Sequence, residues 1–537
     1  MPKAERILIL GAGIMQGPAL RIAKEMGLET VAVDGDPRAP CAALADRFEC
    51  IDLKDKEGIA AFAHTLMTEG GLSGIMTAGT DFSASVAYAA EQAGLPGIPY
   101  EAALNASDKE RMRRCFKTAG VPSPDFRILR APGPGETPGP LPRLPSGYPA
   151  VIKPVDNMGG RGCRRVDSPE DLEAAAPEAL RFSRSGRAIL EEYMEGPEFS
   201  ADAIVYDGEI TLCGFADRHI FFPPSFIEMG HTMPSTLDDA SRDRIMEVFA
   251  AGIRSLGITR GAAKGDLKLT PQGPMIGEIA ARLSGGYMSG WTYPYASGVQ
   301  PVRAAILLAL GKRPEGLEVR RNWTSAERAF ISIPGRVRSL HGLEEAAAAA
   351  FVKDLFLRAK PADRLRFPEN NVDKGGNVIS AAPTREAAVN AAEGAVRSIA
   401  IRLEAPDPET DAFLASGPFR LTSSIPNAFA VPSSLEDRLA ALPEPVLPPG
   451  VEPEFFILPF PELTESGIRD YMGRSVEETL DLVRRLTGLP LPMGAPEGTG
   501  IPLGRRFWSA VIRGGCQGGA YMVDCLVNQI AGDAPKQ

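Results

Sequence analysis

The sequence has few of the residues from which disulfide frameworks and zinc sites are built. Its 537 residues include seven cysteines and four histidines, and no two cysteines form a CxxC pair. An odd and dispersed set of cysteines in a long chain is typical of reduced thiols rather than of a disulfide framework or a zinc centre. The histidines are as widely scattered, so a histidine-rich metal cluster is not predicted either.

Long apolar runs and an excess of positive charge are also missing. After Lys3, Glu5 and Arg6, only four aliphatic residues precede Gly11, which is too few for the core of a signal peptide. No apolar run approaches the ~20 residues that cross a bilayer. With 58 Lys and Arg against 68 Asp and Glu, the formal net charge is −10, which argues against binding to nucleic acid or anionic membranes. We therefore expect a cytoplasmic protein with neither kind of partner.

The length predicts several domains, at about 100–200 residues each, and the N-terminal part shows a parallel α/β pattern. Strands are predicted at 6–10, 30–34 and 72–77, with helices at 56–69 and 83–93. Strands that alternate with helices indicate βαβ units and a parallel sheet.

The turn after the first strand invites a dinucleotide-binding interpretation. Its glycines, Gly11, Gly13 and Gly17, are spaced GxGxxxG, and Asp34 ends the second strand. A Rossmann fingerprint needs GxGxxG with an acidic residue about 20 residues further on. Because the match is imperfect, a tight strand-to-helix turn is at least as good an interpretation.

A helix is predicted from Ser107 to Gly120, with Ser107 as its N-cap and Glu110 completing a capping box. Later helices are expected at 343–350 and 385–404. The region beyond residue 405 is rich in proline, and we assign no chemistry to it. Its glycine cluster at 514–519, before an apolar helix, is best interpreted as a packing device.

The segment from Val151 to Gly162 carries a more specific signal. Lys153 ends an apolar strand, and a loop with Gly159, Gly160, Arg161 and Gly162 follows. Glycine lets the backbone approach a polyphosphate closely, and the free backbone N–H groups form an anion site. A surface hairpin would not explain a lysine in an apolar strand, because a buried ammonium without an anionic partner is costly.

Two hairpins are predicted, one with strands at 198–206 and 209–216 and a second with strands at 261–269 and 274–281. The second hairpin carries a pair of acidic residues. A three-residue loop at 271–273 would place Asp266 opposite Glu278. Opposed carboxylates repel unless a divalent cation lies between them, and oxygen ligands favour Mg²⁺ or Mn²⁺ over zinc. The alternative is an exposed charged hairpin face on which Lys264 and Lys268 neutralise the acids.

In this order, the motifs resemble the ATP-grasp superfamily, which includes L-amino acid ligases, carbamoyl phosphate synthetase large chains and biotin carboxylase. The resemblance covers about residues 5–405 and rests on "SDKERMRRCFKTAGVPSP", "VIKPVDNMGGRGC", "ILEEYMEGPEFSAD" and "GDLKLTPQGPMIGEIAARLSGG". It implies a mixed α/β and α+β fold. We expect a Rossmann-like pre-ATP-grasp domain (1–105), a nucleotide-binding core (106–330), the C-terminal part of the ATP-grasp module (331–405) and an appended α+β region (406–537).

The resemblance also implies a role for individual residues. ATP would be held at its phosphates by two lysines and the glycine loop, and at its adenosine end by a hinge segment. The implied ATP-binding residues are Lys109, Lys153, Gly159, Gly160, Arg161, Gly162, Glu191, Glu192, Tyr193, Met194 and Glu198. The implied metal ligands are Asp266 and Glu278, and the implied catalytic residues are Arg282, Lys264 and Lys268.

Two positions depart from the family pattern. The usual E-x-N-x-R reads Glu278-Ile-Ala280-Ala-Arg282 here, so an amide that often helps to hold the second metal is absent. Lys264 stands where many ligase-like members carry histidine. Because the predicted register places Lys264 across from Ala280, we hypothesise that its ammonium fills the space of the missing asparagine.

The resemblance favours an ATP- and magnesium-dependent carboxylate–amine ligase that works through an acyl phosphate. Small carboxylates and amines would be its substrates, and a homodimer is the default assembly. Other functions stay open at this point: a bicarbonate- or formate-activating enzyme, an ATP-binding module without turnover, and an NAD(P) oxidoreductase.

Overall fold

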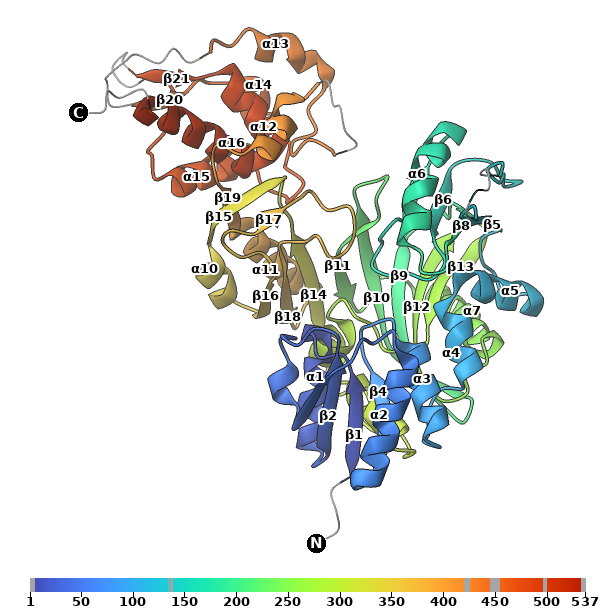
Figure 1. Cartoon of the computed structure of the whole chain (residues 1–537). Coiled ribbons are helices and arrows are strands. Elements are labelled where there is room, and N and C mark those ends of the chain that lie inside the picture. The colour runs from blue at the N-terminus through green and yellow to red at the C-terminus, as the bar shows by residue number, and fades with distance from the viewer. Residues whose placement is uncertain are drawn as a thin grey trace. The chain divides into compact units, whose positions relative to one another are not determined.

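The computed structural model (Figure 1) describes residues 5–133, 135, 139–419, 425–444, 454–495 and 500–532. The chain forms two compact units. The first comprises Met1–Glu327 with Ala381–Val389, and the second comprises Arg328–Ser380 with Asn390–Gln537. The domain boundaries expected from the sequence stay a prediction. Within the described ranges, no helix is both long and apolar enough to cross a membrane.

The first unit begins with the predicted parallel sheet, in the order β3-β2-β1-β4 (Figure 1). Alternate residues of β1 face opposite sides: Ile7 and Ile9 pack toward α1 and α9, while Leu8 and Leu10 pack toward α2 and α3. The half-exposed β3 and the helix α4 were not predicted. The elements are β1 (Arg6–Leu10), α1 (Gly17–Glu25), β2 (Glu29–Asp34), β3 (Arg47–Cys50), α2 (Lys56–Glu69), β4 (Gly74–Thr77), α3 (Ser83–Gln92) and α4 (Tyr100–Ser107).

The glycine turn after β1 is filled by a side chain of the protein itself. Gln16 accepts a hydrogen bond from the Gly13 N–H at 3.0 Å and donates to the Ala78 carbonyl. A Cβ at Gly11 would lie 2.9 Å from Gln16 Cδ. Asp34 accepts from the Ala12 N–H at 2.8 Å, so this carboxylate also serves the turn. The contacts favour the tight-turn interpretation over a dinucleotide site.

The helix expected from Ser107 begins one residue later. Asp108, not Ser107, is the N-cap of α5 (Lys109–Ala119), because its carboxylate accepts from the N–H groups of Glu110 and Arg111. Ser107 instead ends α4 and donates to the Ala103 carbonyl. The correction has a simple cause: α4 occupies the preceding residues, and Asp is as good a cap as Ser.

An antiparallel sheet in the order β5-β8-β6-β7 carries the glycine loop between β6 and β7, as predicted. Helix α6 covers it, and Ser168 caps this helix by accepting from the Asp171 N–H. Ile152 and Leu190 pack with Leu172 in their shared core. The elements are β5 (Phe126–Arg130), β6 (Ala150–Pro154), β7 (Arg164–Val166), α6 (Pro169–Phe182) and β8 (Arg187–Glu192).

The remainder of the first unit is an antiparallel sheet whose strands run in the order β13-β12-β9-β10-β11. Phe249 of α7 packs on it with Phe116 of α5. The elements are β9 (Glu198–Tyr206), β10 (Glu209–Phe221), β11 (Ile227–Met233), α7 (Asp239–Ser255), β12 (Gly261–Thr270), β13 (Gly273–Ala280), a π-helical turn (Met288–Thr292), α8 (Tyr293–Ser297) and α9 (Pro301–Ala309).

The loop between β12 and β13 is shorter than predicted. Thr270 pairs with Gly273, so the loop has two residues rather than three. The extra residue lies further along β13, where a bulge at Gly277 separates the pairs Leu267–Ile276 and Asp266–Glu278. The two differences cancel, and the predicted pairing of Asp266 with Glu278 is confirmed.

The second unit contains two groups of paired strands, one around β15 and one around β18. The helix expected at 385–404 is wrong in its last part, because it ends at Ser398 and β19 follows. Ile401 pairs with Leu340 of β15 and is buried. This strand pairing and burial decide the structure of residues 400–403 over their helix propensity. The elements are β14 (Thr324–Phe330), β15 (Gly335–His341), α10 (Leu343–Ala348), β16 (Val352–Leu357), β17 (Arg364–Leu365), β18 (Gly376–Ala382), α11 (Arg385–Ser398) and β19 (Ala400–Leu403). Of these, β14, β18 and α11 include residues of both units.

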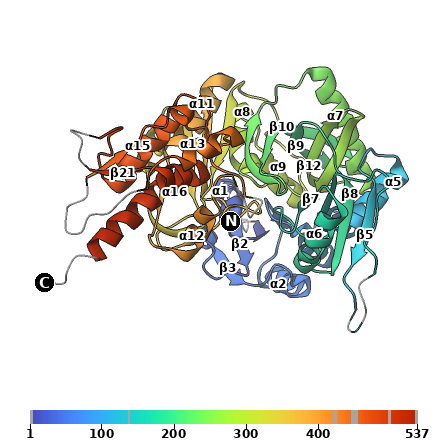
Figure 2. The same cartoon turned by 90° about the horizontal axis from the view of Figure 1, so that it is seen from above.

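The C-terminal region has its own hydrophobic core, in which Trp508 and Val511 of α16 pack with Val483 of α15. Helices α15 and α16 lie side by side (Figures 1 and 2). The glycine cluster lies inside α16, which is kinked at Gly515, rather than before the helix. The elements are α12 (Pro408–Ala415), α13 (Glu436–Ala440), β20 (Phe455–Ile457), α14 (Pro461–Thr464), α15 (Val476–Thr487), β21 (Ile501–Leu503) and α16 (Arg505–Gly532).

We expect Gly518→Ala to destabilise the second unit by about 1–3 kcal/mol, the usual cost of overpacking. A Cβ at Gly518 would lie 2.1 Å from the Ala510 carbonyl oxygen. Gly394→Ala is the matched control, since its Cβ would meet only the end of Arg397 at 4.0 Å. Scanning calorimetry of both variants gives the measurement, and equal melting temperatures would contradict the packing role of the cluster.

Candidate active site

A buried carboxylate, Glu191 at the end of β8, links the strand of the glycine loop to helix α5. Its Oε2 lies 2.6 Å from Lys153 Nζ, and its Oε1 accepts a hydrogen bond from Arg113 Nε at 2.8 Å. Burial raises the pKa of Glu191, but Arg113 and Lys153 outweigh this effect and hold it below its usual value. The ionised carboxylate therefore positions the Lys153 ammonium. The adenine contact that the resemblance implies for Glu191 stays a prediction.

The glycine loop beside Lys153 has the backbone of an anion site. Gly159, Gly160 and Gly162 have φ values of 71°, 75° and 65°, in the left-handed region that favours glycine. Lys109, the first residue of α5, is buried and donates to the Asn157 carbonyl of this loop at 3.0 Å. The two predicted phosphate lysines thus come from the two elements next to this loop, Lys153 from β6 and Lys109 from α5.

The two acidic residues of the hairpin are mostly buried, with 15% of the Asp266 side chain and 27% of the Glu278 side chain exposed. Glu278 lies 3.3 Å from Lys109 Nζ. Asp266 pairs with Lys264 and lies 3.0 Å from Arg218. The cations neutralise the acids, as the alternative interpretation had it, but they do so in a buried site rather than on an exposed face.

The electrostatics of this site keep both carboxylates ionised. Burial raises the pKa of Asp266, but Arg218 and Lys264 outweigh it and lower the pKa to about 2. Burial likewise opposes ionisation of Glu278, whose pKa Lys109 nevertheless lowers. Burial also disfavours the charged form of Lys109, yet Glu278 and Asp81 raise its pKa. At neutral pH the site therefore presents charged oxygens and charged ammonium groups.

Arg218 is a central residue of the site that the sequence analysis missed. It contacts three carboxylates: Glu198, Glu228 at 2.8 Å and Asp266 at 3.0 Å. Burial lowers its pKa, but these acids outweigh burial and raise the pKa above its usual value. The predicted strand ended at residue 216, whereas β10 continues to Phe221, and only this extension brings Arg218 beside β9 and β12.

The hinge residues cluster at the other end of β12. Lys268 donates to the Met194 carbonyl at 3.0 Å and lies 3.4 Å from Glu198. Its ammonium is 5.2 Å from the centroid of the Tyr193 ring. The structure therefore places Lys268 with the predicted adenosine-binding residues rather than with the carboxylate pair. Glu192, next to them, donates its backbone N–H to the Asp125 carbonyl at 3.0 Å.

The segment after β13 is anchored by a buried carboxylate that the sequence analysis also missed. Asp202 of β9 accepts from the N–H and the hydroxyl of Ser284. Its pKa is raised to about 6 by burial, against the opposing hydrogen bonds of Ser284. Arg282 has no carboxylate partner among the described residues, and its buried Nε has no hydrogen-bond partner there. A guanidinium that lacks a carboxylate partner is suited to bind an anion.

A histidine between two acids lies against the same segment. His231 Nδ1 is 3.0 Å from Glu327 Oε2, and its Nε2 is 3.6 Å from Glu228. A Cβ at Gly286 would lie 2.9 Å from Glu228 Oε1 and 3.2 Å from His231 Cε1, so no side chain fits there. The two acids compensate the buried imidazole within the fold.

We expect the protonation of His231 to stabilise the fold at low pH. Burial lowers its pKa, but Glu228 and Glu327 outweigh burial and raise it. The stabilisation is then complete below the unfolded pKa, about 6.5, and is lost as the pH rises through the raised folded pKa. Urea unfolding of the wild type and of His231→Gln from about pH 5.5 to 8.5 measures this, and a difference in unfolding free energy that stays constant with pH would contradict it.

Comparisons with known proteins agree with this geometry. The ATP-grasp domain family matches residues 146–290, and the family described as L-amino acid ligase C-terminal domain 2 matches residues 329–404. Similar curated proteins include the uncharacterized protein y4rH of Sinorhizobium fredii, 25% identical over 383 residues (70% of this chain, 78% of that protein). Carnosine synthase 1 of Gallus gallus is 28% identical over 329 residues, which are 57% of this chain and only 35% of the synthase.

Formate-dependent phosphoribosylglycinamide formyltransferase of Mycolicibacterium gilvum is 28% identical over 270 residues (45% of this chain, 62% of that protein). Among solved structures, L-amino acid ligase from Bacillus licheniformis has a TM-score of 0.65 at 21% identity, covering 75% of this chain and all of the ligase. The biotin carboxylase–ATP complex from Campylobacter jejuni has a TM-score of 0.56 at 21% identity, covering 74% and 92%. At such identities these two structures show a shared fold. In agreement with the glycine loop and the paired carboxylates, residues 146–290 match the ATP-grasp domain family and residues 329–404 match the C-terminal domain 2 of L-amino acid ligases.

Proposed function

We propose that the protein is a carboxylate–amine ligase that uses ATP and Mg²⁺ and releases ADP and phosphate. The observation that carries this proposal is the ionised pair Asp266 and Glu278, in register on one hairpin. The two lysines beside the glycine loop, Lys109 and Lys153, complete the arrangement. The similarity to carnosine synthase 1 and to L-amino acid ligase from Bacillus licheniformis supports it.

The residues present fit a magnesium ion and a nucleotide. Within the described ranges, no group of three or more Asp, Glu, His or Cys side chains is arranged to hold a metal. Mg²⁺ does not need such a group, because proteins hold it through one or two carboxylates together with substrate phosphates. Asp266 and Glu278 would be those carboxylates. When bound, the ion would neutralise charge on the phosphate oxygens.

The chain's own residues account for the remaining needs of the reaction. Lys109 and Lys153 would bind the phosphate oxygens, and the N–H groups at 159–162 would close over them and exclude water. Arg282 would orient the substrate carboxylate. A carboxylate oxygen then bonds to the γ-phosphorus as the bond to ADP breaks, and the amine next bonds to the acyl carbon as phosphate leaves with the electron pair. The amine loses a proton in this second step.

The first experiment measures ADP and phosphate release from Mg-ATP with pooled carboxylates, with and without pooled amines. Lys153→Met is expected to abolish release, whereas Lys117→Met, an exposed lysine of α5, is the matched control. Release that needs both pools supports the ligase. Release with formate or bicarbonate alone would favour the second candidate, a formate- or bicarbonate-activating enzyme, which the formyltransferase relative favours. ATP binding without release under any condition would favour a binding module.

We expect Lys264→Met to lower ATP turnover by about 10²-fold and to change its dependence on Mg²⁺. Lys264 pairs with Asp266, and in the sheet it lies opposite Ala280 on one side and Asp202 on the other. Its ammonium thus occupies the neighbourhood of the asparagine that the family pattern has at position 280. Lys312→Met, an exposed lysine of the same unit, is the control. Unchanged turnover with unchanged metal dependence would disprove the role.

The expected homodimer stays a prediction. Sedimentation equilibrium of the full chain would measure its mass directly and decide between monomer and dimer.

A further inference from the structure

A cavity of about 860 Å³ lies in the first unit, and its lining includes none of the residues assigned above to ATP or Mg²⁺. Its walls come from the loop before α2, the start of α3, helices α4 and α5, and the residues that flank β6 and β8. Cavities of this size are typical of sites for small organic ligands. The chemistry of its lining indicates which class of ligand it would take.

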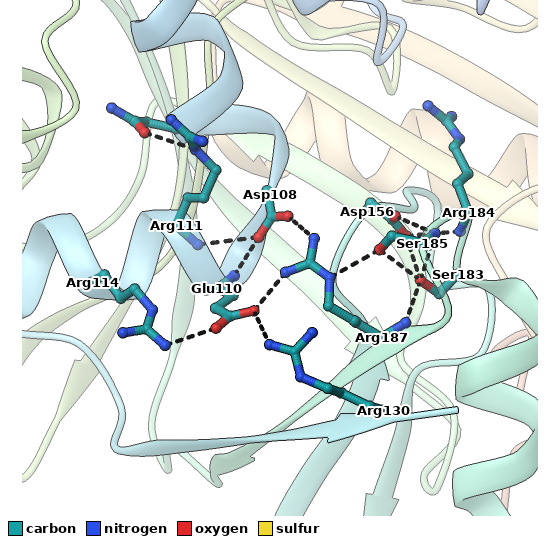
Figure 3. Close-up of polar contacts among 11 residues, drawn as sticks. Asp108, Glu110, Arg111, Arg114, Arg130, Asp156, Ser183, Arg184, Ser185 and Arg187 are labelled. Atoms are coloured by element: carbon teal, nitrogen blue, oxygen red, sulfur yellow. Dashed lines mark hydrogen bonds and ion pairs between the residues drawn. The ribbon is translucent and has the colours of Figure 1, made fainter. Parts of the chain in front are cut away.

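Most acidic groups of the cavity are already paired (Figure 3). Arg187 binds both Asp108 and Glu110, and Arg114 lies 2.8 Å from Glu110. Burial lowers the pKa of Arg187, but these two carboxylates outweigh it and raise the pKa. Asp156 accepts from the Ser183 hydroxyl at 2.8 Å and from two backbone N–H groups. Asp108 and Glu110 are therefore neutralised by arginines, whereas Asp156 keeps its charge and is held by neutral donors of residues 183–185.

Two cations of the lining have no such partner. Lys54 and Arg184 are exposed, and neither side chain has a carboxylate partner among the described residues. Figure 3 shows the Arg184 side chain directed away from the paired network. Its guanidinium lies 5.4 Å from the centroid of the Phe82 ring, on another wall of the cavity. The one other acid in the lining is Asp81, whose charge helps to raise the pKa of Lys109 in the nucleotide site.

We propose that this cavity is a second ligand site, which binds a small organic anion with two negative charges. Lys54 and Arg184 would each take one charge, and the Phe82 ring, which already lies near the Arg184 guanidinium, would form an apolar wall. A dicarboxylate and a phosphate monoester share the required chemistry. Because the cavity borders Asp156, which leads into the glycine loop, a ligand here is close to the nucleotide site without entering it.

The test measures binding by titration calorimetry at low salt, using the full chain with its nucleotide site filled by a non-hydrolysable ATP analogue and Mg²⁺. The probes are succinate, inorganic phosphate and, as a singly charged comparison, acetate. We expect succinate or phosphate to bind saturably at one site per chain and more tightly than acetate. Binding of succinate alone would identify the dicarboxylate class, and binding of phosphate alone the phosphate class.

The variant Lys54→Gln/Arg184→Gln is expected to weaken this binding at least about tenfold, since each charge-assisted hydrogen bond is worth about that factor or more. Both residues are exposed, so the variant should fold, and circular dichroism checks that it does. Arg181→Gln, an exposed arginine of α6 outside the cavity, is the matched control. The proposal is overturned if neither dianion saturates, or if the double variant binds as tightly as the wild type. No turnover is measured, so this result is independent of the ligase proposal.

Discussion

Replacing Glu278 by glutamine is expected to lower ADP release by about 10²–10³-fold, the usual loss when one preorganised electrostatic group is removed from a reacting phosphate. The substitution keeps the shape of the side chain but removes the charge that faces Asp266 and pairs with Lys109. The metal ion would lose one of its two protein ligands. We therefore also expect weaker binding of Mn²⁺, which can be followed by its electron paramagnetic resonance signal in the presence of ADP.

The control for this experiment is Glu247→Gln, an exposed acid on α7 that lies outside the site. It should leave both ADP release and Mn²⁺ binding unchanged. If Glu278→Gln binds Mn²⁺ as tightly as the wild type, the carboxylate pair is not the metal site. A loss of turnover would then have to come from the pairing of Glu278 with Lys109.

The second large effect is expected at Arg113, whose replacement by methionine should cost about 3–5 kcal/mol in the local stability of β8 and α5. Arg113 and Glu191 are 1% and 2% exposed, and their atoms are 2.8 Å apart. Removing the guanidinium leaves the buried carboxylate with Lys153 as its remaining partner. Arg113 also donates to the carbonyl of Gly277, so the bulge beside the carboxylate pair loses a contact.

Hydrogen–deuterium exchange of the peptides that cover β8 and α5 measures this local stability directly. Arg114→Met changes the next residue of the same helix, whose side chain is 68% exposed, and it should have little effect. Arg113→Met combined with Glu191→Gln should recover part of the loss, because the buried side chain that lost its Arg113 partner is then no longer charged. Equal exchange rates in Arg113→Met and Arg114→Met would contradict the structural role.

The sequence was sufficient for those features that depend on neighbours in the chain. The apolar run of β1 and the glycine loop after Lys153 follow from local periodicity and turn chemistry. The pairing of Asp266 with Glu278 was also predicted, although the loop is one residue shorter and the bulge at Gly277 compensates. The shorter loop and the bulge shift the strand pairing in opposite directions, and the two shifts cancel. The sequence therefore predicted the two acidic residues more securely than it predicted the pairing of their strands.

Only the tertiary structure brought together the charges that surround the site. Arg113, Asp202, Arg218 and His231 were given no role from the sequence, because each acts on a residue from a different element. Arg218 meets Asp266 only when β10 and β12 both pair with β9, and Glu191 meets Arg113 only when α5 packs beside β8. Burial then gives these long-range pairs their strength: away from water, an ion must be compensated by whichever partner the fold places beside it.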